Sequence, residues 1–171
     1  MSWPGMNGTV IHQGKVRSEW IDVNDHMNVS YYVLAFDLAV DALWEEFGIT
    51  DEYMKSRRGS TFAVESHVTY QNELLNGDQY IVTSQILGFD EKRIHQFQRL
   101  YHADKKYLAA TAEWMNLHVD LDARRVSPWP ADILAKIRAF STTQSDRTWP
   151  EPAGRQMTLK APLFSLLAEQ Q

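Results

Sequence analysis

The sequence contains no cysteine. Disulfide bonds, zinc sites with cysteine ligands and a thiol nucleophile are therefore excluded. No apolar run approaches the roughly 20 residues that a membrane-spanning helix needs. The first residues also lack a basic stretch followed by an apolar core, so no secretory signal is visible. We expect a cytoplasmic protein with no membrane partner.

The charge balance excludes another class of partner. The chain carries 17 Lys and Arg against 22 Asp and Glu, a net charge of -5, and a nucleic-acid binder would usually carry a basic stripe. His67, His95, His102 and His118 lie on predicted strands without metal-ligand spacing, so we expect no metal site. The length of 171 residues fits one domain with a hydrophobic core.

Residues 30–47 predict a long helix, because this stretch has no Gly or Pro and Gly48 provides a stop. Asn28 or Ser30 could cap its start. The helix is apolar on most sides, so we expect other structure to wrap it. Its polar stripe, which we expect to face solvent, consists of Asp37, Asp41 and Glu45.

Strands are predicted on both sides of this helix. A weak alternation precedes it at residues 14–21, and a short helix is expected at 131–140. The strands after the long helix are residues 61–71, 79–88, 92–102 and 107–119, with turns at 76–78 and 104–106. We divide the chain into an N-terminal arm (1–13), one domain (14–140) and a C-terminal tail (141–171).

This order predicts an α+β architecture in which an antiparallel sheet curls around one long central helix. Such an arrangement is the hotdog fold. Turn-forming and polar residues gather just before the helix, in the string Asp22-Val23-Asn24-Asp25-His26-Met27-Asn28. A helix N-terminus offers unpaired N–H groups, which suit an oxyanion, and a nearby carboxylate or imidazole can supply acid–base chemistry. The plainer alternative is that these residues only cap and turn the chain.

The same string, followed by Tyr31-Tyr32, resembles the first signature of hotdog acyl-CoA thioesterases of the 4-hydroxybenzoyl-CoA thioesterase type. It is also similar to the D-x-N-x-H string of plant acyl-carrier-protein thioesterases. The resemblance continues through residues 64–78 and 110–130. It implies an enzyme that hydrolyses a small-molecule acyl-CoA thioester without a cofactor, since coenzyme A is part of the substrate. It also implies a homodimer or a dimer of dimers.

The resemblance assigns roles to particular residues. Asp22 takes the place of the catalytic carboxylate, the N–H near Val29 that of the oxyanion donor, and Asn24 and His26 those of polar partners. Many relatives carry an acidic residue where this chain has Trp20, which implies an aromatic wall at the acyl site. The residues expected to contact substrate are Trp20, Asn28, Tyr32, Lys92 and Arg93; for the last two, a solvated hairpin end is the alternative.

A narrower resemblance concerns the acyl group. Residues 87–97, 110–113 and 117–120 resemble the thioesterase module fused to some carnitine dehydrogenases. That module hydrolyses betainyl-CoA to glycine betaine and CoA, which makes betainyl-CoA the first expected substrate. Two alternatives stay open. One is a hotdog hydratase acting on enoyl-CoA, although its D-x-N-P-x-H spacing differs; the other is a non-catalytic acyl-CoA-binding protein.

Overall fold

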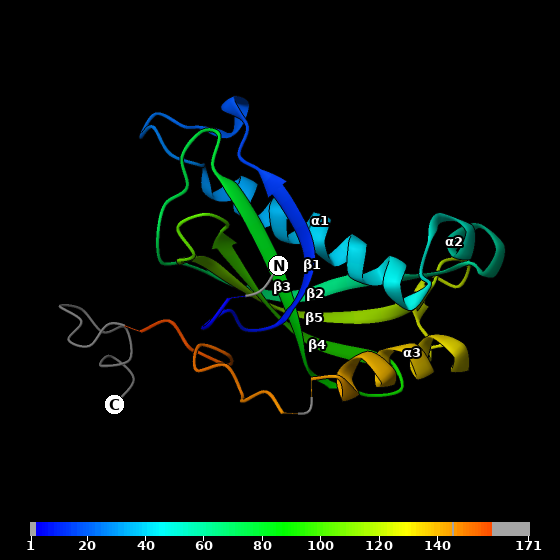
Figure 1. The fold of residues 1–171 in the computed structure, drawn as a ribbon. Helices are drawn as coiled ribbons and strands as arrows, with labels where there is room; N and C mark the ends of the chain where they lie inside the picture. Colours follow the sequence, from blue (N-terminus) through cyan, green and yellow to red (C-terminus); the bar gives the residue numbers. More distant parts are fainter. Residues whose placement is uncertain (1–2, 145, 159–171) are drawn as a thin grey trace, which may run out of the picture.

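The computed structural model describes residues 3–144 and 146–158, which form one antiparallel sheet with helices on one face (Figure 1). The sheet order is β1-β3-β4-β5-β2, with the short β6 paired to β5. The strands are β1 (Thr9–Lys15), β2 (Gly59–Tyr70), β3 (Gln79–Phe89), β4 (Arg93–His102), β5 (Leu108–Asp120) and β6 (Arg125–Val126). The four strands predicted after the long helix are therefore confirmed.

The long helix is confirmed as α1 (Val29–Phe47). Asn28 is its N-cap, and Gly48 ends it in a left-handed conformation with φ 87°, which glycine adopts without steric penalty. The other helices are a 3-10 turn η1 (Ser18–Trp20), α2 (Asp51–Arg57) and α3 (Ala131–Thr142). No helix in the described part of the chain is long and apolar enough to cross a bilayer.

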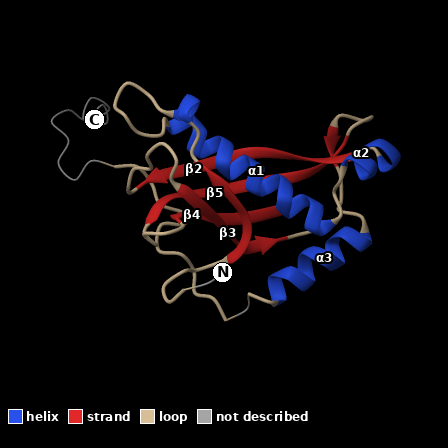
Figure 2. Ribbon diagram, turned by 45° about the horizontal axis from the view of Figure 1, so that its top comes forward, coloured by secondary structure: helices blue, strands red, loops and turns tan. Residues whose placement is uncertain are grey.

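Helix α1 lies across one face of the curled sheet, and α3 lies on the same face (Figure 2). Two buried clusters hold it there. The N-terminal half of α1 packs against β1, β3, β5 and the loop before the helix, through residues such as Phe36, Tyr80 and Met27. The C-terminal half packs against α2, α3 and the sheet through Phe47, Ile94 and others. This arrangement confirms the α+β hotdog fold.

One expectation about α1 is wrong in the single chain. We expected the helix to be wrapped on all sides, but its outer side is partly open. Val29 is 55% exposed, and Val33, Leu34 and Leu38 are each between a third and two fifths exposed. One sheet and two short helices cannot cover the whole circumference of a 19-residue helix.

The start of the chain also differs from the prediction. Of residues 14–21, only Gly14 and Lys15 lie in a strand, because the chain leaves the sheet after Lys15 and forms η1. The strand at this edge is β1, which lies mostly in the segment assigned to a loose arm. A Cβ on Gly14 would fall 2.3 Å from the Tyr80 ring, so glycine is needed where these two strands pack closely.

The segment after α3 begins as part of the packed structure. The Ile86 N–H donates to the Gln144 side-chain oxygen at 2.9 Å, and Gln144 is buried. The first residues of the expected tail therefore contact the sheet. Residues 159–171, which belong to the same expected tail, lie outside the described residues.

Candidate active site

The loop between η1 and α1 carries the expected catalytic residues and is fixed by backbone hydrogen bonds. The Asp22 N–H donates to the His26 carbonyl at 3.0 Å, which closes the loop on itself. The Met27 N–H donates to the Leu74 carbonyl at 2.8 Å and ties the loop to the connection before β3. Asp25, at the tip, has φ 61°, a conformation that Asp tolerates better than most residues. The loop therefore has one defined shape.

The Asp22 carboxylate points back into this loop. Its Oδ1 accepts a hydrogen bond from the Asn24 N–H at 2.9 Å, and its Oδ2 accepts one from the Asn28 side-chain amide at 3.3 Å. The His26 Nδ1 lies 3.9 Å from Oδ1. The side chain is 20% exposed, so the carboxylate is held in place yet can be reached from solvent.

Asn28 connects this carboxylate to the helix. Its side-chain oxygen accepts from the Ser30 N–H at 3.0 Å and caps α1, while its amide nitrogen donates to Asp22. The Val29 N–H has no hydrogen-bond partner among the described residues. The structure therefore places a carboxylate beside a free donor at the positive end of a 19-residue helix. Asn28 therefore contacts Asp22, and its expected contact with substrate stays a prediction.

The other two polar residues of the loop are less tightly held. The His26 ring lies 3.3 Å from the Met27 carbonyl, and a third of its side chain is exposed. Asn24 is exposed and contributes its backbone N–H, not its side chain, to the Asp22 interaction. Both side chains are open to solvent, and their roles as polar partners of Asp22 stay predictions.

Trp20 and Tyr32 lie in the core and not on the open surface of the loop. Each is 4% exposed, and the Trp20 ring stacks on Tyr31 at 5.3 Å with an interplanar angle of 11°. The Tyr32 hydroxyl accepts from the Leu74 N–H at 2.9 Å. Burial raises the pKa of Tyr32 to about 12. Trp20 and Tyr32 belong to the same buried cluster as Met27 of the loop, so they support the loop from the core. The expectation of an aromatic wall at the acyl site did not include this role.

Lys92 and Arg93 lie far from Asp22 in the same chain. They follow the end of β3, whose 11 residues span on the order of 30 Å from the loop side of the sheet. Arg93 Nε donates to Asp90 at 2.7 Å. The Lys92 N–H, followed by the Arg93 side chain, lowers the pKa of Asp90 to about 2. Within one chain, these two cations and Asp22 do not form a common site.

Comparison with known proteins identifies the family. The model of the thioesterase-like superfamily matches residues 16–137. This chain belongs to the thioesterase-like superfamily. It is 33% identical over 144 residues to a betainyl-CoA thioesterase of Pseudomonas aeruginosa, covering 84% of this chain and 91% of that protein.

Two further similarities support this membership. An L-carnitine dehydrogenase/betainyl-CoA thioesterase of Rhizobium meliloti is 36% identical over 146 residues, which are 85% of this chain and 29% of that longer protein. A Staphylococcus aureus protein solved in complex with CoA is 30% identical and superposes with a TM-score of 0.84, covering 92% of this chain and 99% of that one.

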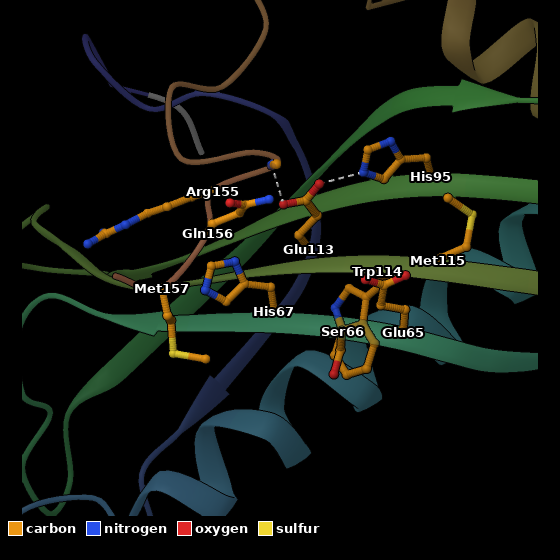
Figure 3. A pocket seen from close by; sticks show the side chains of 11 residues that line it. Glu65, Ser66, His67, His95, Glu113, Trp114, Met115, Arg155, Gln156 and Met157 are labelled. Carbon is orange, nitrogen blue, oxygen red and sulfur yellow. Dashed lines mark hydrogen bonds and ion pairs between the residues drawn. The ribbon is translucent and has the colours of Figure 1, made fainter. Parts of the chain in front are cut away.

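This thioesterase-like chain also has a cavity of 470 Å³ on the opposite face of the sheet, lined by β2, β4, β5 and residues 154–157 (Figure 3). Glu113 is its central polar group. Its carboxylate contacts His95 Nε2 at 2.6 Å and accepts from the Gly154 N–H at 2.8 Å. Glu113 therefore fastens the segment after α3 to the sheet. Asp22 is not among the residues that line this cavity.

Proposed function

We propose that this chain is an acyl-CoA thioesterase whose reaction takes place at Asp22, and that it hydrolyses betainyl-CoA to glycine betaine and CoA. The observation that carries the proposal is the Asp22 carboxylate fixed by Asn28 beside the free Val29 N–H. The choice of acyl group is supported by the betainyl-CoA thioesterases to which the chain is similar.

The proposed chemistry assigns one task to each group. Asp22 acts as general base or as nucleophile. As a base it takes a proton from water while the water oxygen attacks the thioester carbonyl carbon. The oxyanion that forms accepts a hydrogen bond from the Val29 N–H, aided by the helix dipole. The carbon–sulfur bond then breaks, and the CoA thiolate takes the proton from Asp22.

Asn24 and His26 have a supporting role in this scheme. Their side chains lie on the open side of the loop, so they orient the water and the substrate without holding Asp22. Trp20 and Tyr32 keep the loop in position from the core.

We also propose that the chain works as a homodimer. Strand β2 is an open edge of 12 residues, and it exposes the apolar side chains of Phe62, Val64 and Tyr70. A long, apolar, unpaired edge favours pairing with another strand. A two-fold axis that pairs β2 with its own copy would cover this edge and the open side of α1. Light scattering at micromolar protein should give the mass of a dimer or a multiple of it; a monomer would contradict the proposal.

The dimer also bears on coenzyme A. In an antiparallel β2 pair, the Gly59 end of one strand lies beside the Tyr70 end of the other. The β3–β4 hairpin, at the Gly59 end, would then lie nearer the partner's Asp22 than its own. Lys92 and Arg93 of one protomer are therefore proposed to approach the coenzyme A phosphates bound at the partner's loop.

The test is a thiol-release assay on the purified chain with betainyl, short-chain, long-chain and aromatic acyl-CoAs. We expect the highest kcat/KM for betainyl-CoA. Release of thiol only from other acyl-CoAs would support thioesterase activity and contradict betainyl-CoA as the substrate. A change in enoyl-CoA absorbance without thiol release would indicate a hydratase, and neither signal would indicate a binding protein.

A further inference from the structure

A second cavity, of 320 Å³, lies between α1, α2 and β2, elements that can be followed in Figure 1. Its volume is at the lower end of the range for ligand pockets. No Lys, Arg or His lines it. Its charged residues are all acidic, and we call it the acidic pocket: Asp37, Asp41, Glu45 and Asp51, together with Trp44 and Asn116.

The carboxylates of the acidic pocket are not neutralised. In the described part of the chain none of the four forms an ion pair, whereas an exposed acid nearby, Asp132, binds Arg57 at 2.7 Å. Burial, followed by the neighbouring charges of Asp37 and Glu45, raises the pKa of Asp41. Like charges four residues apart destabilise a helix, so this stripe carries negative charge that no group of the described chain offsets.

Two uncharged residues show what kind of ligand fits there. Trp44, which is 6% exposed, is among the residues that line the pocket, and an indole ring attracts cations, quaternary ammonium groups in particular. Asn116 is 3% exposed, and its side-chain nitrogen has no hydrogen-bond partner among the described residues. A buried donor left unpaired is rare. The pocket therefore suits a small cation that carries an acceptor atom close to its charge.

We propose that the acidic pocket binds the cationic head of the acyl group and selects it over neutral acyl groups. The betainyl group meets both requirements, because its trimethylammonium is one methylene away from a carbonyl. The inference rests on the proposed thioesterase function and names the residues that set its specificity. Asp37 and Asp41 attract the charge, Trp44 contacts the methyl groups, and Asn116 donates to the acyl oxygen.

The pocket of one protomer serves the loop of the other. Asp37 follows Val29 by eight residues, about 12 Å along the helix, which is too far for an acyl group with one methylene between charge and carbonyl. The Tyr32 ring contacts Tyr70, whereas the pocket contacts the opposite end of β2, at Ser60. Antiparallel pairing of β2 with its copy brings the partner's Tyr70 end, and with it the partner's loop, toward this pocket.

The experiment compares two substrates of nearly the same shape, betainyl-CoA and its neutral counterpart tert-butylacetyl-CoA. The kcat/KM of each is measured for the full chain, for Asp37→Asn, for Asp41→Asn, and for Glu46→Gln as matched control. Glu46 carries the same charge on α1 but does not line the pocket. Melting temperatures confirm that each variant folds.

We expect the full chain to prefer betainyl-CoA. Each Asp→Asn variant should lose roughly threefold to tenfold of that preference, with little change for tert-butylacetyl-CoA, and Glu46→Gln should behave like the unmodified chain. Three results would contradict the role proposed for the acidic pocket: equal losses for both substrates, no loss, or a full chain that prefers tert-butylacetyl-CoA. None of them would contradict the thioesterase activity. Hydrolysis of neither compound would contradict the betainyl proposal and this inference together, and thiol release from other acyl-CoAs would still identify a thioesterase.

Discussion

The Asp22 loop and the acidic pocket, the two acidic regions beside α1, are built in opposite ways. At the N-terminus, Asp22 accepts two hydrogen bonds, and Asn28 uses both its oxygen and its nitrogen. In the middle of the helix, Asp37 and Asp41 form no ion pair in the described part of the chain, and no cationic residue lines their pocket. A carboxylate that accepts two hydrogen bonds is fixed in position, as a catalytic group must be. A carboxylate without a cationic partner is free to attract a charged ligand. The difference therefore separates a group positioned for catalysis from groups that recognise the substrate.

The largest effect is expected when Asp22 is replaced. Asp22→Asn keeps the shape of the side chain and removes its charge, so the loop should fold. If Asp22 is the base or nucleophile, kcat should fall by roughly 100-fold or more, while KM changes little because the proposed coenzyme A contacts are made by Lys92 and Arg93, which the substitution leaves in place. Steady-state kinetics with a melting curve measure both. A folded variant with near-full activity would refute the mechanism; Asn24→Ala and His26→Ala should lose less.

A smaller effect is expected at Asn28, where two replacements separate its two tasks. Asn28→Ala removes the cap and the donor to Asp22, so it should lower the free energy of unfolding by about 1 kcal/mol and reduce kcat by roughly tenfold. Asn28→Ser keeps a capping oxygen but loses the amide donor.

Chemical denaturation and kinetics on the two Asn28 variants provide the comparison. We expect Asn28→Ser to be nearly as stable as the unmodified chain and as slow as Asn28→Ala. Equal kcat in Asn28→Ser and the unmodified chain would mean that the contact with Asp22 has no part in catalysis.

The smallest effect is expected at Asp41 in the acidic pocket, and it concerns the free energy of unfolding. The raised pKa of Asp41 means that its protonated form is favoured in the folded chain. Its ionisation therefore opposes folding, and the stability present below pH 3.8 is lost as the pH rises through the raised pKa. Asp41→Asn should raise the free energy of unfolding at pH 7 by a few tenths of a kcal/mol. The gain should vanish near pH 3, and a loss at pH 7 would contradict the absence of a compensating cation.

The sequence was a good guide wherever the signals are local. The helix at residues 30–47 was predicted from an uninterrupted apolar pattern with a cap and a glycine stop, and the strands after it from alternation between turns. The strand predicted at 14–21 was wrong because Val16 and Trp20 are buried by a turning chain, not by a strand. Helix α2 was missed because its seven residues are too few to show a period.

The site was only partly accessible from the sequence. The string from Asp22 to Asn28 identified the loop, but the contact between these two side chains depends on how the loop closes. The acidic pocket could not be foreseen, because it requires α1, α2 and β2 to meet in space. Asp37 and Asp41 are exposed, as the sequence predicted, but the pattern gives no sign that Trp44 and Asn116 line a cavity beside them.

The central claim is a site shared between the Asp22 loop of one protomer and the acidic pocket of the other. Mixed dimers test it most directly. Asp22→Asn and the double variant Asp37→Asn/Asp41→Asn are co-expressed with different affinity tags, and the heterodimer is purified through both. A shared site leaves one native loop facing one native pocket, so the kcat/KM for betainyl-CoA should reach about half that of the unmodified dimer. If each site lies within one chain, the heterodimer would stay below the more active parent variant, and that result would contradict the shared site.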